Sequence, residues 1–173
     1  AWEVVPAPES ELEWRVGDAA LGRCSTDCYV CSPILQPRLS PCRADLVVRP
    51  ITVAGVERLA AACGRHGVPL TLRGSGTGNY GQCVPLEGGV VMLCGALREV
   101  EHLDPSTGVV TVQPGCLMRD LDQHLRPHGR QLRLLPSTWR SASIGGFLAG
   151  GSGGIGSIRW GFLRDPGHLL GAE

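Results

Sequence analysis

The sequence predicts a mixed α+β fold, and three patterns support this prediction. A strand, a helix and a second strand follow one another over residues 46–73, which indicates two parallel strands joined by a right-handed crossover. Residues 99–113 have instead the pattern of an antiparallel hairpin. Because no series of strand–helix units follows, we expect separate parallel and antiparallel regions rather than a doubly wound sheet.

Each element of the first region has a local signal. Leu46–Arg49 is a short apolar strand that ends at Pro50. Thr52 is a helix N-cap, and Gly67 is the expected stop of that helix. The apolar residues at helical spacing between them are Val56, Leu59, Ala60 and Cys63. The remaining elements are a strand over 69–73, a long loop over 74–89 and a strand over 90–93.

The second region continues with the hairpin and one amphipathic helix. The turn at 104–108 joins strands predicted over 99–103 and 109–113. Pro127 and Gly129 close the following helix. Its apolar positions are Leu117, Met118, Leu121 and Leu125. From Pro136 onward the chain is rich in glycine and serine.

The first 43 residues contain six acids, five prolines and little periodicity. They predict an N-terminal arm over 1–43, with at most a short helix near Ser10 to Trp14. We expect the folded domain to span residues 44–173.

Composition excludes several classes of function. Sixteen basic and sixteen acidic residues cancel, so the total charge favours neither nucleic acid nor an anionic membrane surface as partner. All sixteen basic residues are arginine, which excludes a Walker phosphate loop and a lysine Schiff base. No segment has membrane-spanning length. Eight cysteines without a secretory signal favour a reduced, intracellular setting, cytoplasmic or organellar.

Two glycine-rich segments are candidate phosphate-binding loops. The first is Arg73-Gly-Ser-Gly-Thr-Gly-Asn-Tyr-Gly-Gln82, whose bare amides can approach a phosphate closely. It matches the dinucleotide fingerprint, but Pro85 follows where that fingerprint requires a helix. The second, residues 143–156, is expected to offer another run of unobstructed amides. The alternative for the first segment is a flexible surface loop, since such short patterns also match by accident, whereas two separated segments suit a pyrophosphate held from both sides.

Four strings in fixed order carry a resemblance to a known family. They are DLVVRP at 45–50, VPLTLRGSGTGNYGQCVPLEGGVV at 68–91, VQPG at 112–115 and PSTWRSASIGGFLAGGSGGIGSIRWG at 136–161. Together they resemble the FAD-binding domain of the vanillyl-alcohol-oxidase or PCMH type, in its glycolate oxidase and D-lactate dehydrogenase branch. The resemblance covers residues 45–173 and implies a fold of two α/β subdomains with an extended FAD between them.

The resemblance also implies site residues. The pyrophosphate would be held by Gly74, Ser75, Gly76, Thr77, Gly78 and Asn79. The cofactor would be lined by Pro114, Gly115, Pro136, Ser137 and Thr138, and supported by Ser143, Ile144, Gly145 and Gly146, with Gly150 and Gly151 as further contacts. Some relatives attach FAD covalently to a histidine in the first loop. Thr77 occupies that place here, so the expectation is non-covalent FAD.

The implied activity is oxidation of a 2-hydroxy acid of the glycolate or D-lactate type by hydride transfer to FAD, with a further electron acceptor. The family pattern continues beyond Glu173 into more of the flavin domain and a cap domain whose Arg and His residues bind substrate. We therefore expect the catalytic residues to lie outside this chain. The alternative is a non-catalytic truncated product that binds FAD weakly or serves as a partner surface. Unpaired strand edges and exposed apolar surface predict poor solubility of the chain alone.

Three other motifs have competing interpretations. The cysteines Cys24, Cys28 and Cys31 have the CxxxCxxC spacing of an iron–sulfur or zinc site, with Cys42 as a fourth candidate ligand. They also lie in an SxDxYxxSP stretch that the family shares, in which Cys28 and Cys31 replace aromatic residues. Residues 150–154 match GxSxG without a preceding strand, and His124 and His128 lack the Glu of a zinc motif. We expect no metal site at these positions.

Overall fold

The computed structural model describes residues 3–4, 11–15 and 17–173, and the chain divides into two compact units, residues 1–97 and 98–173. The first unit contains β1 (Glu3–Val4), β2 (Leu12–Arg15), α1 (Asp18–Cys24), η1 (Cys28–Cys31), α2 (Gln36–Leu39), β3 (Leu46–Pro50), α3 (Val53–His66), β4 (Leu70–Arg73), β5 (Val90–Leu93) and η2 (Cys94–Ala96). The second contains β6 (Val100–Leu103), β7 (Val110–Val112), α4 (Met118–Leu125), η3 (Arg126–His128), α5 (Ile144–Ala149) and α6 (Ser157–Trp160).

The first unit is built on a five-stranded sheet with the order β1-β2-β3-β5-β4. Strands β3, β5 and β4 are parallel, while β2 runs antiparallel to β3 and β1 antiparallel to β2. The predicted strand–helix–strand unit is confirmed, although β5 lies between its two strands. The mixed α+β class is also confirmed, because β6 and β7 form a separate antiparallel sheet.

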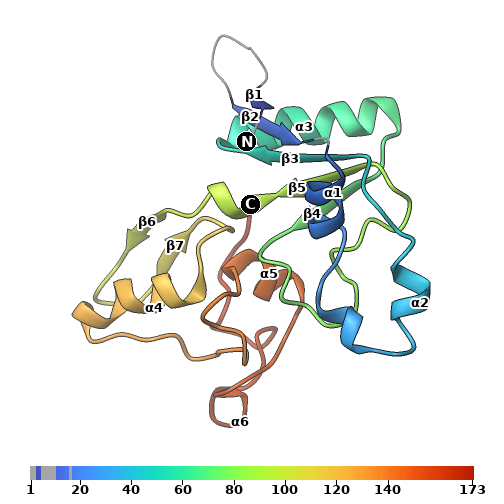
Figure 1. Cartoon of the computed structure of the whole chain (residues 1–173). Helices are drawn as coiled ribbons and strands as arrows, with labels where there is room; N and C mark the ends of the chain where they lie inside the picture. Colours follow the sequence, from blue (N-terminus) through green and yellow to red (C-terminus); the bar gives the residue numbers. More distant parts are fainter. Residues whose placement is uncertain (1–2, 5–10, 16) are drawn as a thin grey trace. The chain divides into compact units, whose positions relative to one another are not determined.

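Helices cover both faces of this sheet because successive strand residues point to opposite sides. Val48, Val90 and Met92 pack against Leu59 and Cys63 of α3. On the other face, Val47 and Val91 pack with Ala44 and partly buried residues of α1. Figure 1 shows α3 and α1 on these two sides of β3 and β5. The central strands β3 and β5 therefore lie between two apolar layers. Strand β4 pairs with β5, so this packing also positions the end of β4, where the first glycine loop begins.

Helix α3 has the ends that its sequence predicts. The Thr52 side chain accepts a hydrogen bond from the Gly55 N–H at 3.0 Å, which is a typical N-cap interaction. Gly67 ends the helix with a φ of 63°, a left-handed conformation that favours glycine. The face between these caps buries Leu59 and Cys63 against the sheet.

The prediction of a short helix near Ser10 to Trp14 is wrong where it can be tested, because residues 12–15 form strand β2; Ser10 lies outside the described residues. Leu12 to Arg15 alternate between apolar and charged residues, which is the period of a strand. Glu13 lies opposite Arg49 in β3, and their side chains form an ion pair. A partner 36 residues away thus decides the conformation.

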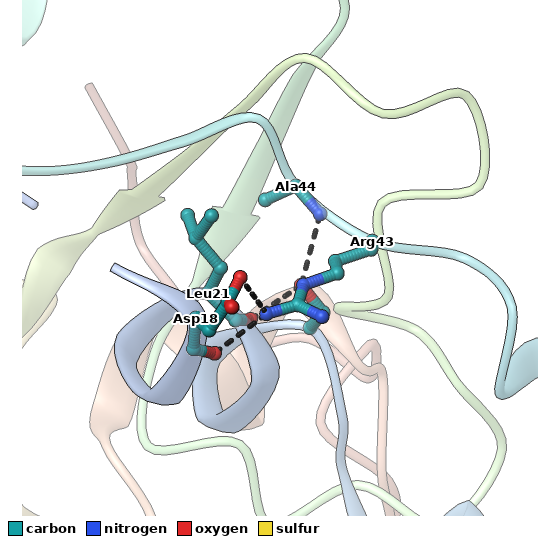
Figure 2. Close-up of polar contacts among 5 residues, drawn as sticks. Asp18, Leu21, Arg43 and Ala44 are labelled. Carbon is teal, nitrogen blue, oxygen red and sulfur yellow. Dashed lines mark hydrogen bonds and ion pairs between the residues drawn. The ribbon is translucent and has the colours of Figure 1, made fainter. Parts of the chain in front are cut away.

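The segment between β2 and β3 is attached to the sheet through α1. Arg43 donates hydrogen bonds to the backbone oxygen and the carboxylate of Asp18, at 2.7 and 3.1 Å. Ser25 donates to the Leu21 oxygen at 2.6 Å and accepts from the Ala44 N–H at 2.9 Å. Figure 2 shows Asp18 and Leu21 facing Arg43 and Ala44. Residues of the predicted arm therefore make specific contacts with the chain that enters β3.

The second unit packs a hairpin and two helices around an apolar interior. The antiparallel pairing of β6 with β7 confirms the predicted hairpin, and α4 confirms the predicted helix from Met118 to Leu125. Leu121 and Leu125 of α4 pack against apolar residues of both strands. Met118 lies in a neighbouring cluster with Phe147 of α5. Among the described residues, no helix is long and apolar enough to cross a membrane.

Candidate functional site

The first glycine loop leaves the sheet directly after Arg73, the last residue of β4. Residues 74 and 76–78 are half-buried, while Ser75 and Asn79 are exposed. Within the described part of the chain, no backbone N–H from Ser75 to Asn79 donates a hydrogen bond. Five consecutive donors are therefore available to a ligand, which is the arrangement that an anion-binding loop needs.

Arg73 lies against the inner side of this loop. Its Nη1 atom donates hydrogen bonds to the backbone oxygens of Thr26 and Cys24, at 2.6 and 3.3 Å, and to the Cys83 sulfur at 3.0 Å. Gly76 has a φ of 69°, and a Cβ on it would overlap the Arg73 guanidinium. The loop thus follows the surface of an arginine closely, and only a glycine fits at residue 76.

Burial raises the pKa of the Cys83 thiol, although the nearby Arg73 guanidinium acts in the opposite direction. The thiol therefore stays protonated at neutral pH, and its sulfur accepts the arginine hydrogen bond without carrying a charge. The positive charge of Arg73 is not neutralised by Cys83.

Asp27 joins the loop to the N-terminal segment. Its carboxylate is buried, and it accepts hydrogen bonds from the N–H groups of Tyr29 at 2.7 Å and Gly81 at 3.0 Å. The next residue, Cys28, donates its N–H to the Gly78 oxygen at 2.9 Å. Burial raises the pKa of Tyr29, with the Asp27 charge adding to the effect. Asp27 and Cys28 therefore hold the loop in place through hydrogen bonds to Gly81 and Gly78.

The other predicted site residues belong to the second unit, and the structure brings two of their segments together. The Gly145 N–H donates to the Pro114 oxygen at 2.9 Å, and the Ile144 N–H donates to the Cys116 oxygen at 2.8 Å. A Cβ on Gly145 would lie 2.6 Å from the Pro114 Cβ. The start of α5 is thus packed against the Pro114-Gly115 turn, and the glycine at 145 permits this approach.

These contacts correct one expectation. The amides at the start of the second glycine segment are obstructed, because Ile144 and Gly145 donate to the chain and Gly146 donates to the Ser143 hydroxyl at 3.4 Å. Ser143 is a buried N-cap of α5. The sequence pattern predicted free N–H groups at residues 144–146, but these groups form hydrogen bonds within the chain.

The remaining predicted residues lie on either side of α5. Residues 136–138 form a turn in which the Thr138 oxygen accepts from the Ala142 N–H at 2.9 Å, and this turn leads into Ser143. Within the described chain, neither Ser137 nor Thr138 donates its backbone N–H to another residue. Gly150 and Gly151 follow the C-terminal end of the helix, so it separates them from Ser143 by about 9 Å at 1.5 Å per residue.

The competing motifs do not assemble into sites. Across the described residues, no three His, Cys, Asp or Glu side chains are placed to hold a metal ion, and Cys28 and Cys31 are exposed. Ser152 of the GxSxG pattern follows helix α5 rather than a strand. His168 contacts the Trp160 backbone oxygen at 2.8 Å. Among the described residues, the three cysteines are thus not gathered at one point, and the GxSxG serine has no strand before it.

Sequence reasoning did not single out Asp27 or Arg73 as parts of the site. One signal for Asp27 was present: an Asp two residues before Tyr29 is typical of an Asx turn, and the structure has that turn. The contact with Gly81, 54 residues away, had no such signal.

The loop that ends β4 passes a test of fit for a nucleotide cofactor. It presents unused N–H donors, close backbone approach at Gly76 and an adjacent arginine, all of which suit a bound pyrophosphate. The Ser143–Gly146 segment offers packing and the exposed surface of Gly146, but few free donors. The two segments therefore differ in the contacts they can offer.

Comparison with known sequences gives a consistent result. The sequence model described as "FAD binding domain" matches residues 44–172. The chain is 32% identical over 129 residues to glycolate oxidase subunit GlcD of Bacillus subtilis, covering 75% of this chain and 27% of that protein. It is 33% identical over 133 residues to the Escherichia coli K12 subunit of the same name, covering 77% of this chain and 26% of that protein. A probable mitochondrial D-lactate dehydrogenase of Danio rerio is 33% identical over 121 residues, covering 70% of this chain and 24% of that protein. The chain spans about a quarter of the length of these relatives.

Solved structures show the same fold. An alkyldihydroxyacetonephosphate synthase matches 88% of this chain and 31% of its own with a TM-score of 0.76, at 23% sequence identity. A second structure of an enzyme with that name, in another crystal form, matches with the same TM-score at 22% identity and covers 88% of this chain and 29% of its own. At this identity the likeness concerns the fold alone.

Proposed function

The chain belongs to the FAD binding domain family, and from this premise we propose that it is the FAD-binding part of an oxidoreductase that oxidises a 2-hydroxy acid such as glycolate or D-lactate. The family membership confirms the PCMH-type resemblance and FAD as the cofactor. The relatives named glycolate oxidase subunit and D-lactate dehydrogenase support the substrate class.

The observation that carries the proposal is the row of unused N–H groups from Ser75 to Asn79 at the end of β4. These donors lie side by side next to a partly buried arginine, and no group of the described chain accepts from them, so they are free to bind the oxygens of a ligand. A pyrophosphate supplies several acceptor oxygens and two negative charges. Residues 74–79 would therefore hold the FAD pyrophosphate.

The other predicted contacts remain part of this proposal. Pro114, Gly115, Pro136, Ser137 and Thr138 would line the cofactor, with Ser143, Ile144, Gly145, Gly146, Gly150 and Gly151 as supporting residues. Since Ile144 and Gly145 donate their N–H groups to the chain, their role would be to shape and pack the site. No histidine occurs between residues 67 and 101, so attachment of FAD is proposed to be non-covalent.

The chemistry that FAD supplies when bound is acceptance of a hydride from the carbon that carries the substrate hydroxyl. Residues of this chain would orient the cofactor and hold its phosphates. We place the groups that bind the hydroxy acid, and those that pass electrons to an acceptor, outside these 173 residues. The boundary between an arm at 1–43 and a flavin domain at 44–173 stays a prediction.

The first experiment is an absorption spectrum of the purified chain after incubation with FAD and removal of free FAD. Retained flavin bands that are fully released by denaturation support a non-covalent site. Absence of flavin binding at FAD concentrations up to about 1 mM, a very weak affinity on the usual scale, contradicts the proposal. Flavin that stays with the denatured chain contradicts the non-covalent part alone.

A turnover assay tests whether the catalytic groups lie outside this chain. The FAD-loaded chain is mixed with glycolate, D-lactate and L-lactate and an artificial electron acceptor, and we expect no turnover. Robust turnover would contradict the placement of catalytic groups outside the chain. The substrate class is tested with a longer protein that contains this sequence and has the length of its relatives. If neither D-lactate nor glycolate reduces the flavin of that protein, the proposed substrate class is wrong.

A further inference from the structure

We propose that Asp27 is a positioning residue for the glycine loop, one that fixes the direction of the loop's N–H groups and thereby its affinity for FAD. The inference rests on the proposed function, which assigns residues 74–79 to the pyrophosphate. It adds a residue from the predicted arm to the cofactor site.

The Asp27 carboxylate bridges the N-terminal segment and the glycine loop. Asp27 is 6% exposed, and its two oxygens have different partners: Oδ1 accepts from the Tyr29 N–H and Oδ2 from the Gly81 N–H. The local bond to Tyr29 sets the side-chain orientation, because it closes an Asx turn. The second oxygen then lies where it can hold the end of the loop.

Peptide planarity links these hydrogen bonds to the direction of the neighbouring N–H groups. The Cys28 N–H holds the Gly78 oxygen, and in a trans peptide the N–H of the following residue points the opposite way. The Asn79 N–H is therefore directed away from residues 27 and 28. By the same rule, the hydrogen bond from the Gly81 N–H to Asp27 turns the Tyr80 oxygen away from the carboxylate. The contacts of residues 27 and 28 thus set the direction of the Asn79 N–H and fix the C-terminal end of the row of donors.

Arg73 places a positive charge near the Asp27 carboxylate. A buried carboxylate below an anion-binding loop would repel the ligand unless a cation lay nearby. Arg73 supplies that cation: its guanidinium binds the backbone oxygen of Thr26, the residue before Asp27. The Cys83 sulfur lies 3.0 Å from Arg73 Nη1 and 4.0 Å from Asp27 Oδ2. The positive charge of Arg73 therefore lies close to Asp27 and opposes the repulsion between its carboxylate and an anion on the loop.

The proposal makes a different prediction from a purely structural role for Asp27. A structural carboxylate would affect the stability of the first unit and leave the affinity of the folded chain for FAD unchanged. A positioning carboxylate would weaken FAD binding in chains that remain folded. Asp45 is a matched control, because its Oδ2 accepts from the Gly89 N–H at 2.7 Å in the same unit, at the far end of the long loop.

The experiment compares Asp27→Ala, Asp27→Asn and Asp45→Asn with the unaltered chain. Thermal unfolding is measured without cofactor, and the Kd for FAD is measured by flavin fluorescence well below each Tm. We expect Asp27→Ala to raise Kd by about tenfold to a hundredfold, the effect of losing hydrogen bonds to a charged acceptor. Asp27→Asn should have a smaller effect, because its amide oxygen still accepts one bond. Asp45→Asn should change Tm little, because its amide oxygen can still accept the one bond from Gly89, and should leave Kd within about twofold of the original.

A second variant keeps the test decisive if Asp27→Ala does not fold. Cys28→Pro removes the N–H that holds the Gly78 oxygen and replaces an exposed thiol. Residue 28 is the first residue of η1, where proline is well tolerated, and Asp27 before it is already extended, with φ −130° and ψ −155°. We expect this variant to stay folded and to bind FAD at least about fivefold more weakly, the effect of one lost hydrogen bond.

Unchanged FAD affinity in folded Asp27→Ala or Cys28→Pro would overturn the inference. Hydrogen exchange of the cofactor-free chain provides a readout that does not need FAD: the Gly81 N–H should exchange faster in both Asp27 variants and not in Asp45→Asn. If the unaltered chain binds no FAD, the proposed function fails. The Asp27 contact is then judged by exchange at Gly81 alone, where equal rates would overturn it.

Discussion

Gly76 lies so close to Arg73 that a Cβ on residue 76 would overlap the arginine Nη2 atom. The same glycine has a φ of 69°, a left-handed conformation. Arg73 cannot easily move aside, because it donates to two backbone oxygens and one sulfur. The strand end and the loop are therefore coupled through one guanidinium group.

Replacement of this glycine should damage the proposed cofactor site. We predict that Gly76→Ala raises the Kd for FAD by at least about tenfold, since the left-handed conformation alone costs about 1–2 kcal/mol for a residue with a Cβ. The overlap with Arg73 adds to this cost. Fluorescence titration with FAD measures the effect.

The matched control is Gly64→Ala in α3, where a Cβ has open space. It should stabilise the chain by up to about 1 kcal/mol through helix propensity and leave the FAD affinity unchanged. Equal affinity of Gly76→Ala and the original chain would show that the Arg73 contact does not determine the loop conformation.

A second prediction concerns the interior of the first unit. Leu59 of α3 packs against Val48, Val90 and Met92 on one face of the sheet. Leu59→Ala should lower the free energy of unfolding by about 2–5 kcal/mol, because it removes buried apolar surface and leaves a cavity. Urea unfolding measures this change. Val53→Ala at the exposed start of the same helix should change stability by less than about 0.5 kcal/mol. Similar losses in both variants would contradict the packing of α3 on the sheet.

The sequence predicted those elements whose signals are local. Thr52 and Gly67 define α3, and the apolar run at 90–93 defines β5, because caps and short apolar strands depend on neighbouring residues. Strand β2 was not predicted, because its conformation depends on pairing with β3 across a long chain separation. In the candidate site, glycine content located the loop at 74–79.

The sequence pattern does not show which N–H groups of the glycine segments donate to other parts of the chain. Glycine-rich strings look alike whether their N–H groups are free, as at residues 75–79, or donate to Pro114 and Cys116, as at Gly145 and Ile144. Only the tertiary fold distinguishes the two cases. The same holds for Asp27, whose second hydrogen bond joins distant segments.

A third prediction concerns stability at alkaline pH. Burial raises the pKa of the Cys116 thiol, and the Asp120 charge acts in the same direction. The unfolded chain therefore loses the Cys116 proton at lower pH than the folded chain, so stability should fall as pH rises above the ordinary thiol pKa of about 8.5. Cys116→Ala should reduce the slope of unfolding free energy between about pH 8.5 and 10, measured by urea unfolding. Cys31→Ala, at an exposed position, is the control. A slope that Cys116→Ala leaves unchanged would contradict the assignment.

The last prediction concerns self-association through the C-terminal part of the second unit. Several large apolar side chains are exposed there, with Ile158 fully exposed, and the others are Ile155, Trp160, Phe162, Leu169 and Leu170. Arg133 and Arg159 lie over the Trp160 ring, at 5.1 and 4.8 Å from its centroid, so the aromatic surface is partly covered while the aliphatic residues are not.

Exposed apolar side chains favour association, so we expect sedimentation velocity to show oligomers that increase with protein concentration. Ile158→Ser should shift the distribution toward the monomer and raise the soluble yield. It should leave the unfolding free energy within about 0.5 kcal/mol, because Ile158 contributes no buried surface. Leu86→Ser, which replaces an exposed leucine of the first unit, is the matched control and should have no such effect. A monodisperse monomer at high concentration would show that this surface does not drive association.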